Sequence, residues 1–330
     1  MFVLGIESSC DETSASILKD GKILSNVVVS QLIHEKYGGV VPALASKNHE
    51  QLINKVVKQS LEDASITIEN VDAIAVTQGP GLIGSLLIGL NYAKGISIGL
   101  RKPLIGVNHL HGHIVSGLID NDVKYPFLCL LVSGGHTQIL KVNSDINYEI
   151  LARTVDDAAG EAFDKGARIL GLKYPGGPEI DKISKDGVLG NYHFTIPKVK
   201  SNLVDFSFSG MKTALLYKVN SLTNVELKKE ICNIAVSYQE AIIDTLFEKL
   251  KMVLGMNKVN DILIVGGVSA NSRFRYKSKK FKKDNNINIF FPDLKYCTDN
   301  AAMIAMAGYI KYKKKIYSNI DIIPFSSLKR

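Results

Sequence analysis

The stretch NHLHGH, residues 108–113, places three of the chain's seven histidines within five residues. On a helix, His109 and His113 would lie on one face, one turn apart, which is the spacing at which two imidazoles can bind one cation. His111 would point elsewhere. The zinc-protease signature requires a glutamate directly after the first histidine, and this chain has Leu110 there. The segment is therefore either a cation site of another kind or an ordinary, partly exposed histidine pair.

A catalytic metal ion needs a third protein ligand and open coordination positions. We expect Asp299 to supply the ligand, because the residues 298–300 are a good helix-capping sequence that would expose this carboxylate at a helix start. Cys10 and Cys297 flank acidic residues. They are candidates for soft ligands or for small buried thiols.

Three segments share one design, in which a short aliphatic strand runs straight into small residues: 2–14, 127–140 and 261–271. Alternating apolar residues follow in the first two, as in a hairpin. Such a tip can turn several backbone N–H groups toward one anion. The three tips predict a duplicated, strand-rich architecture that binds a phosphate-bearing ligand between two lobes. The turn at 79–81 opens a helix after a strand, as another anion site or as a tight packing point.

Apolar periodicity predicts helices over residues 49–64, 82–100, 156–170 and 226–254. Asn91 and Lys94 interrupt the second, so we expect a buried helix and not a membrane span. Asp156 or Asp157 is suited to cap the third helix, and residues 174–181 are expected to form a loop.

The composition fits a two-lobed globular protein, with 330 residues, 46% apolar and 22% charged. The 40 Lys and Arg exceed the 32 Asp and Glu to give a net charge of +8, and the excess is densest in residues 272–283 and 311–315. These runs indicate either a solvated lysine face or a nucleic-acid footprint. The four cysteines show no CxxC spacing and residues 1–12 carry no secretory pattern, which favours a reducing cytoplasm.

Ten segments occur in the order typical of one family. They are GIESSCDET, YGGVVPALASKNH, TQGPGLIGSLLIG, HLHGH, LLVSGGHTQI, DDAAGEAFDK, YPGGP, DFSFSGMKT, GGVSAN and CTDNAAMIA. The chain thereby resembles the bacterial-type TsaD family, the tRNA N6-adenosine threonylcarbamoyltransferases, once described as glycoprotein endopeptidases. The resemblance implies an α/β fold of the actin-like, sugar-kinase and heat-shock ATPase (ASKHA) class, with two duplicated ribonuclease-H-like lobes and a central ligand cleft. We expect residues 1–106 to form the first lobe, with 305–330 packing back on it, and 107–304 to form a second lobe that carries the metal and nucleotide site.

The resemblance also assigns roles to single residues. His109, His113 and Asp299 match the family's metal ligands, which implies one divalent ion per chain, iron(II) first and zinc as the alternative. Asp11 and Glu12 match acidic residues tied to catalytic activity. The positions that match substrate-binding residues are Leu131, Val132, Ser133, Gly134, Gly135, Asp164, Gly177, Asp181 and Asn271, with His136 as a further contact. Taken one at a time, these could instead be turn glycines, a helix-surface carboxylate or a helix cap.

The reaction implied by the resemblance transfers the threonylcarbamoyl group of threonylcarbamoyl-AMP to N6 of adenine 37 in tRNAs that read codons beginning with A, releasing AMP. The implied partners are tRNA, threonylcarbamoyl-AMP or another adenine nucleotide, a TsaB-like paralogous dimerisation partner and a TsaE-like small ATPase, in the cytoplasm and with no membrane. Three alternatives stay open: a kinase or ATPase of the same fold, a non-catalytic scaffold and a metallopeptidase.

Overall fold

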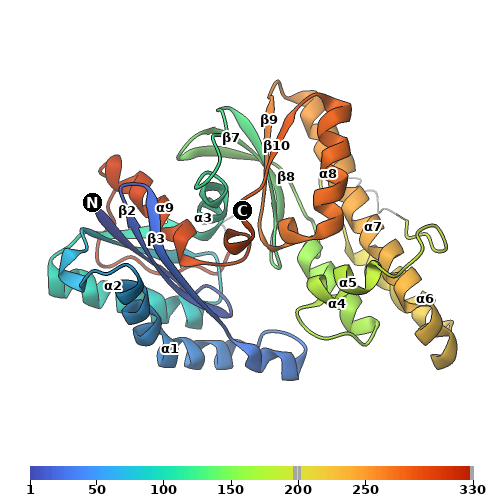
Figure 1. Ribbon diagram of the computed structural model, residues 1–330, viewed down its shortest axis with the longest axis horizontal. Coiled ribbons are helices and arrows are strands. Elements are labelled where there is room, and N and C mark those ends of the chain that lie inside the picture. Colours follow the sequence, from blue (N-terminus) through green and yellow to red (C-terminus); the bar gives the residue numbers. More distant parts are fainter. Residues whose placement is uncertain (196–198, 200–201, 328–330) are drawn as a thin grey trace. The chain divides into compact units, whose positions relative to one another are not determined.

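The computed structural model describes residues 1–195, 199 and 202–327, which form two compact units. Unit 1 comprises Met1–Asn121 and Pro292–Arg330, and unit 2 comprises Asp122–Phe291. Each unit is built on its own five-stranded sheet, and Figure 1 shows the elements of both.

The sheet of unit 1 has the strand order β3-β2-β1-β4-β5. Its strands are β1 (Phe2–Glu7), β2 (Glu12–Lys19), β3 (Lys22–Ser30), β4 (Ala73–Gly79) and β5 (Leu104–Asn108). The first three pair antiparallel, whereas β4 runs parallel to β1 and β5 runs parallel to β4. The hairpin expected at the first small-residue tip is therefore confirmed. The parallel strands are almost wholly buried, as strands covered by helices on both faces must be.

Helices cover both faces of this sheet. Helices α1 (Pro42–Asp63) and α2 (Ile83–Leu100) bury one apolar cluster with Leu4, Ile6 and Ile74. Helices α3 (His109–Ser116) and α9 (Ala301–Lys313) bury a second cluster. Gly5 on β1 permits α9 to pack this closely, because a Cβ there would lie 2.5 Å from the carbonyl oxygen of Ala301.

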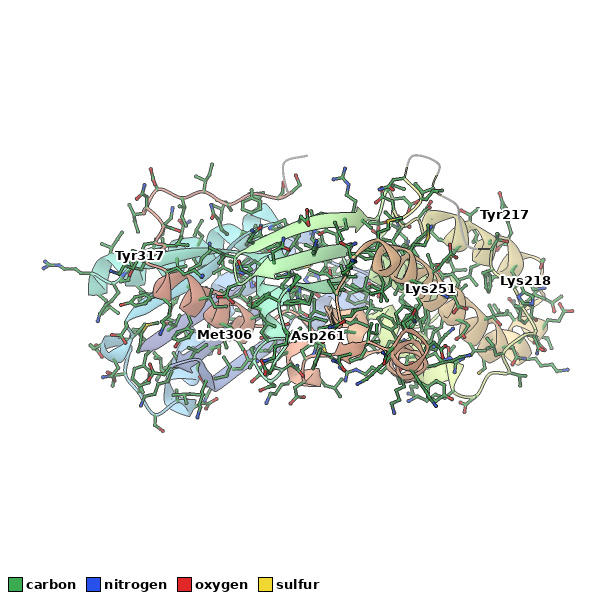
Figure 2. The ribbon with its side chains drawn as sticks, turned by 90° about the horizontal axis from the view of Figure 1, so that it is seen from above. Tyr217, Lys218, Lys251, Asp261, Met306 and Tyr317 are labelled. Atoms are coloured by element: carbon green, nitrogen blue, oxygen red, sulfur yellow. The ribbon has the colours of Figure 1, made fainter. Side chains whose placement is uncertain are left out.

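The C-terminal tail of unit 1 continues from α9, which carries Met306, to Tyr317 and beyond (Figure 2). The amide of Ser318 donates to Leu104 on β5, and the amide of Phe325 donates to Gln78 on β4. The tail thus lies against the edge of the first lobe's sheet. The last three residues of the expected segment 305–330 lie outside the described residues.

Unit 2 repeats the topology of unit 1. Its sheet order, β10-β9-β6-β7-β8, reads backwards as three antiparallel strands followed by two parallel ones. The strands are β6 (Phe127–Val132), β7 (Thr137–Ser144), β8 (Asn147–Arg153), β9 (Asp261–Val265) and β10 (Asn288–Phe290). The expected duplication and the second hairpin are both present.

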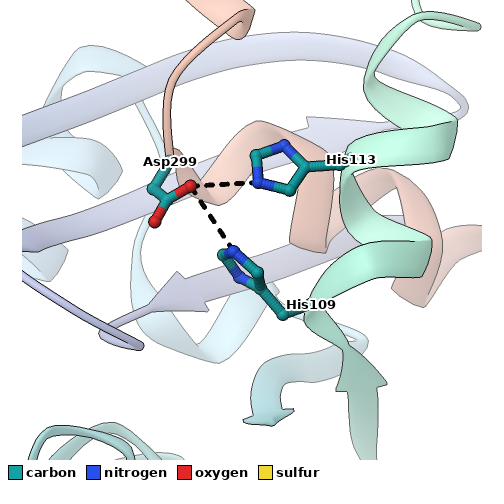
Figure 3. Close-up of side chains that lie close together, drawn as sticks. All are labelled: His109, His113 and Asp299. Carbon is teal, nitrogen blue, oxygen red and sulfur yellow. Dashed lines mark ion pairs between the residues drawn. The ribbon is translucent and has the colours of Figure 1, made fainter. Parts of the chain in front are cut away.

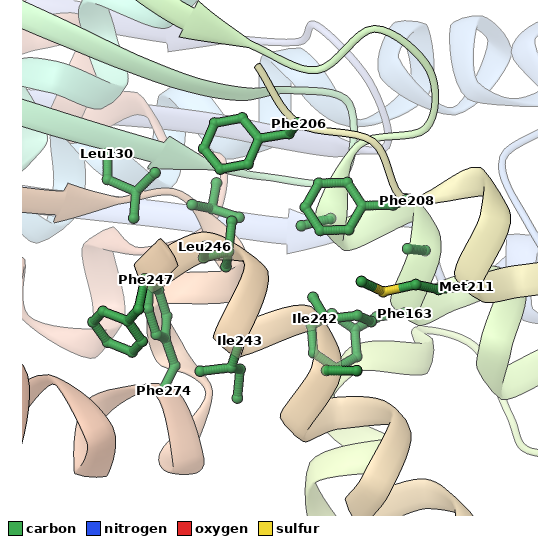
Figure 4. Packing of buried hydrophobic residues seen from close by; sticks show 14 of the residues in the cluster. Leu130, Phe163, Phe206, Phe208, Met211, Ile242, Ile243, Leu246, Phe247 and Phe274 are labelled. Atoms are coloured by element: carbon green, nitrogen blue, oxygen red, sulfur yellow. The ribbon is translucent and has the colours of Figure 1, made fainter. Parts of the chain in front are cut away.

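Five α-helices lie among the described residues of unit 2: α4 (Ala159–Ile169), α5 (Gly176–Ser184), α6 (Ser209–Asn220), α7 (Asn224–Met256) and α8 (Ser272–Asn285). Short 3₁₀ helices lie at Gly267–Ala270 in unit 2 and at Leu32–Tyr37, Ile68–Asn70 and Leu294–Tyr296 in unit 1. The core of unit 2 is formed by one face of α7 together with aromatic side chains from several elements, among them Phe163, Phe206 and Phe274 (Figure 4). This packing fixes the starts of α4, α5 and α8.

Two expectations about local structure require correction. Residues 174–181 are not a loop, because α5 begins at Gly176. Neither Asp156 nor Asp157 caps α4, whose N-cap is Ala158. Asp156 instead accepts hydrogen bonds from the amides of Phe208 and Ser209 at the start of α6.

The domain boundaries also differ from those expected at 106/107 and 304/305, since they fall at 121/122 and 291/292. The reason is that α3 and the start of α9 pack on each other, through Val115, Met303 and Ile304, beneath the sheet of unit 1. The histidine segment and Asp299 therefore belong to unit 1 and not to the second lobe.

Helix α2 is long and apolar enough, by length and composition alone, to cross a membrane. In this fold it packs against α1 and β4, with 33% of the span buried. An exposed face remains along its length. That face consists of Ile83, Gly84, Leu87, Asn91, Gly95, Ile98 and Gly99.

Candidate functional site

The histidine segment begins where β5 ends. Asn108, the last residue of β5, caps α3 by accepting hydrogen bonds from the amides of Leu110 and His111 at 2.9 and 3.2 Å. The helix therefore starts at His109, and His113 follows one turn later on the same face, as expected. Because β1, β4 and β5 are parallel, their carboxyl ends meet at the same edge of the sheet as these histidines.

Asp299 reaches this edge through the start of α9. Asn300 caps the helix by accepting from the amide of Met303, which confirms the expected capping sequence. The next two amides are held by the sheet, since Ala301 donates to Ser14 at 2.8 Å and Ala302 donates to Asn26 at 3.1 Å. Residue 299, directly before the cap, is thereby placed against α3.

Figure 3 shows the resulting cluster. Oδ1 of Asp299 lies 3.0 Å from Nε2 of His113 and 3.4 Å from Nε2 of His109. One ligand atom from each residue lies within 4.8 Å of the others, so the three could hold one metal ion. Both imidazoles are buried, while the Asp299 side chain is 21% exposed, which leaves one side of the cluster accessible.

The donor chemistry fits a divalent transition metal, which is bound by neutral imidazole nitrogens and by carboxylate oxygens. Neither ring nitrogen of His113 has a hydrogen-bond partner of good geometry among the described residues, although both are buried. A buried nitrogen without such a partner is costly unless another group satisfies it. A cation coordinated by Nε2 of His113 would satisfy that nitrogen.

Electrostatics favour charge at this cluster. Burial opposes the charged imidazole, but the carboxylates of Asp299 and Glu7 outweigh it and raise the pKa of His109 well above its usual value. Burial likewise opposes the charged carboxylate, yet His109 and His113 hold the pKa of Asp299 well below its usual value. The carboxylate is thus ionised and ready to accept a cation.

The turn between β1 and β2 carries Asp11, and Glu12 is the first residue of β2. Burial, followed by the negative charges of Asp299 and Asp11, raises the pKa of Glu12 well above its usual value. His49 holds this turn, since its Nε2 donates to the carbonyl of Cys10 at 2.9 Å and its Nδ1 lies 2.8 Å from the hydroxyl of Thr13. Glu12 is therefore a stronger base than an ordinary carboxylate.

The cysteines do not join the metal cluster. Burial and the charge of Asp11 raise the pKa of the Cys10 thiol, which disfavours the thiolate needed for metal binding. Cys297 is buried and its thiol points to the carbonyl oxygen of Asp293 at 3.5 Å. Cys297 is thus a small buried thiol, and Cys10, which is partly exposed, is a protonated thiol and not a ligand.

The expected substrate loop lies in unit 2. Leu131 and Val132 belong to β6, where they pair with β7 and their side chains are fully buried. Ser133 closes the turn, because its amide donates to the carbonyl of His136 at 2.8 Å. Only Gly134 and Gly135 present exposed backbone, so these two are the part of the segment that can face a ligand.

The remaining expected residues form a linked series of contacts in the same unit. Asp164 on α4 accepts from the amide of Gly176 at 2.7 Å and so caps α5, which also carries Gly177 and Asp181. Asp181 accepts from the amide and the hydroxyl of Ser272, at the start of α8.

Asn271 is held at both ends of its side chain. Its amide oxygen accepts from Phe274 at 2.9 Å, and its amide nitrogen donates to Gln239 on α7 at 2.7 Å. The alternative reading of Asn271 as a helix cap is thus confirmed. Asp164, read alternatively as a helix-surface carboxylate, also caps a helix. A ligand contact by either residue would use only its remaining hydrogen-bonding capacity.

A cavity of about 480 Å³ opens between α5, α7 and α8. Polar residues in its lining include Asp181, Lys185, Gln239, Ser272 and Arg273. Of these, only Asp181 was expected from the sequence. Gln239 lies in the middle of a long amphipathic helix, where nothing in its sequence neighbourhood marks a ligand contact.

The class of fold follows from comparison with solved structures. HypF in its phosphate- and nucleotide-bound form matches with a TM-score of 0.63 at 11% identity, over 96% of this chain and 47% of that one. A ROK-family glucokinase from Streptomyces griseus matches with a TM-score of 0.53 at 11% identity, over 95% of this chain and 100% of that one. Together with the repeated sheet order, these likenesses establish an ASKHA-type α/β fold with two lobes.

The sequence comparisons then identify the family. The sequence profile of TsaD, tRNA N6-adenosine threonylcarbamoyltransferase, matches residues 22–306. Proteins with that name from Thermosipho africanus (strain TCF52B) and Kosmotoga olearia (strain ATCC BAA-1733 / DSM 21960 / TBF 19.5.1) are 52% and 49% identical, over 100% and 99% of both chains. The chain belongs to the TsaD family, and it is an enzyme of the transferase class.

Proposed function

We propose that the chain transfers the threonylcarbamoyl group of threonylcarbamoyl-AMP to N6 of adenine 37 in tRNAs that read codons beginning with A, and releases AMP. The observation that carries this proposal is the convergence of His109, His113 and Asp299 on one point in a chain of the TsaD family. A kinase of the same fold would have no use for this donor set.

We assign the three residues to one divalent ion, iron(II) first and zinc as the alternative. When bound, such an ion supplies Lewis-acid stabilisation of negative charge on the carbamoyl or phosphate oxygens of the substrate. The two imidazoles and the carboxylate of Asp299 would hold it, and the partly exposed side of the Asp299 carboxylate would leave room for the substrate.

The protein's own groups act on the two ends of the reaction. A bond forms between N6 of adenine and the carbamoyl carbon, while the bond from that carbon to the phosphate oxygen breaks and AMP leaves. We assign to the exposed backbone of Gly134 and Gly135 the donation of hydrogen bonds to the departing phosphate. Glu12, whose pKa is raised, is the better acceptor for the N6 proton, and Asp11 contributes negative charge beside it.

Lysines on α8 provide the surface for tRNA phosphates. Lys277 is engaged by Glu240 and Asp244, and Arg273 is engaged by Glu240 at 2.8 Å. Arg275 is only partly exposed, and its Nε donates to the carbonyl of Ser269 at 2.8 Å. The other four cations of the run are exposed and lie on the same helix: Lys279, Lys280, Lys282 and Lys283. We therefore assign the contacts with tRNA phosphates to these four lysines. Because the proposed substrate is tRNA, we place the enzyme in the cytoplasm.

We propose that the exposed face of α2 binds a protein partner. Ile83, Leu87 and Ile98 are 41%, 39% and 65% exposed, and Gly95 between them permits a second helix to approach closely. We assign this face to a TsaB-like paralogous chain, and we include a TsaE-like small ATPase as the third component.

The proposal is tested by incubating the purified chain and its two partner proteins with threonylcarbamoyl-AMP and an unmodified tRNA. Mass spectrometry of the digested tRNA should detect threonylcarbamoyladenosine, and a tRNA with guanosine at position 37 should stay unmodified. Rapid ATP hydrolysis without tRNA, and no modified nucleoside, would instead identify a kinase or ATPase of the same fold.

A further inference from the structure

Glu7 is a buried acidic residue that the expected site did not include. It is the last residue of β1, at the edge of the sheet where the histidines lie, and none of it is exposed. A carboxylate is seldom placed in such an environment unless its oxygens are paired. Its contacts therefore indicate a specific role.

Both oxygens of Glu7 are held. Oε1 accepts from the amide of Ser9, and Oε2 accepts from the hydroxyl of Thr77 on the neighbouring strand β4. Oε2 also lies 3.2 Å from Nδ1 of His109, and the Ser9 hydroxyl, which can accept a hydrogen bond, lies 3.3 Å from the same nitrogen. Thr77 is itself fully buried, so the carboxylate cannot turn away without breaking this pairing.

This geometry selects one form of the His109 ring. An ionised carboxylate only accepts hydrogen bonds, so the Nδ1 that faces it must carry the proton. A neutral ring protonated at Nδ1 has its lone pair at Nε2. That nitrogen faces Asp299, at 3.4 Å, in the cluster of Figure 3.

His113 differs in this respect. Its Nδ1 is buried without a hydrogen-bond partner among the described residues, so no comparable group selects its protonated nitrogen. One of the two imidazoles is thus preset for coordination and the other is not. Of the two rings, His109 is the one whose protonated nitrogen a neighbouring carboxylate selects.

We propose that Glu7, held by Thr77, is a positioning residue that keeps the proton of His109 on Nδ1 and so presents Nε2 to the metal ion. This inference rests on the metal site of the proposed function. Some residues do not bind the metal ion but hold a ligating histidine by a hydrogen bond. Substitution of such a residue typically changes the metal affinity by about 10–100-fold.

The first test measures Zn²⁺ affinity of the full-length chain by competition with a chromophoric chelator. Glu7→Gln should weaken Zn²⁺ binding by about 10–100-fold, because the amide NH₂ facing Nδ1 favours the other tautomer. Thr77→Val should weaken it by less. Asp72→Asn is the matched control, since Asp72 accepts from the amide of Phe2 at the opposite end of β1 and should leave the affinity unchanged.

The second test reads the ring directly. In ¹⁵N-labelled wild-type protein, long-range ¹H–¹⁵N correlation spectra should show Nδ1 of His109 protonated, both with Zn²⁺ bound and in metal-free protein at a pH that keeps the ring neutral. Protonation at Nε2, or wild-type Zn²⁺ affinity in a folded Glu7→Gln chain, would overturn the positioning role. A wild-type chain that binds no Zn²⁺ would contradict the metal site itself, so the two failures are distinguishable.

Discussion

The amide of Gly160, in the first turn of α4, donates to the carbonyl oxygen of Ser133 at 3.3 Å and so ties this helix to the exposed glycine turn. A Cβ at position 160 would lie 2.5 Å from that oxygen and 2.8 Å from Cα of Gly134. Separations below 3 Å are not tolerated, and the backbone of the turn cannot yield without moving. Gly160 therefore sets the position of the turn.

Gly160→Ala should displace the turn and weaken AMP binding tenfold or more, measured by isothermal titration calorimetry. Gly255→Ala on α7 is the control, because a Cβ there meets nothing within 4 Å. That substitution should leave AMP binding unchanged and stabilise the fold by about 0.5–1 kcal/mol. Equal AMP affinity in the wild-type and Gly160→Ala chains would show that the turn at Gly134 and Gly135 is not part of the AMP-binding site.

Reversal of two exposed charges on α8 should weaken tRNA binding. Lys280→Glu with Lys283→Glu should lower the affinity at all tRNA sequences alike and reduce the dependence of log Kd on log salt by about 2. The matched pair Lys228→Glu with Lys229→Glu, exposed on α7, should have little effect. Filter binding of both double variants across a salt series measures these effects. Unchanged tRNA binding by Lys280→Glu with Lys283→Glu would show that these lysines form a solvated surface and do not contact tRNA.

Leu87→Glu should break the complex with the paralogous partner while leaving the fold intact, because this side chain is 39% exposed on the apolar face of α2. Val225→Glu, 79% exposed in unit 2, controls for a general effect of surface charge. Size-exclusion chromatography with light scattering should show separate chains only for Leu87→Glu. Intact complex in that variant would assign the partner to another surface.

Glu12→Gln should stabilise the metal-free protein near neutral pH. Because the folded pKa of Glu12 is raised, ionisation is penalised in the folded state, so this carboxylate costs stability above its folded pKa and nothing below its unfolded value near 4.5. The gain in thermal stability should therefore be present at pH 7 and vanish as the pH falls below about 4. The same substitution should abolish transfer, and a stability gain that persists in acid would contradict the raised pKa.

Much of the site was predictable from local sequence. The HxxxH spacing needs only one helical turn, and Asn300 marks the start of the helix that carries Asp299, so both patterns are set by near neighbours. The repeated strand-and-tip design likewise predicted the duplicated sheets. The assignment of His109, His113 and Asp299 to one metal site came from the family resemblance.

The rest depends on contacts between distant parts of the chain. Glu7 and Thr77 meet because β1 and β4 are parallel neighbours, and the sequence does not state that pairing. The domain boundary was misplaced for the same reason, since α9 returns to the first sheet and packs on β1, β2 and β4, with Gly5 allowing the close approach. Residues 174–181 were expected to be a loop because Pro175, Gly176 and Gly177 are turn formers, yet the Asp164 carboxylate caps a helix there.

The most direct measurement is the metal content of purified wild-type chain and of the double variant His109→Ala with His113→Ala, determined by elemental analysis alongside the transfer assay. We predict about one iron or zinc ion per wild-type chain, and neither bound metal nor threonylcarbamoyladenosine with the double variant. Full transfer by a double variant that holds no metal would contradict the metal-assisted reaction.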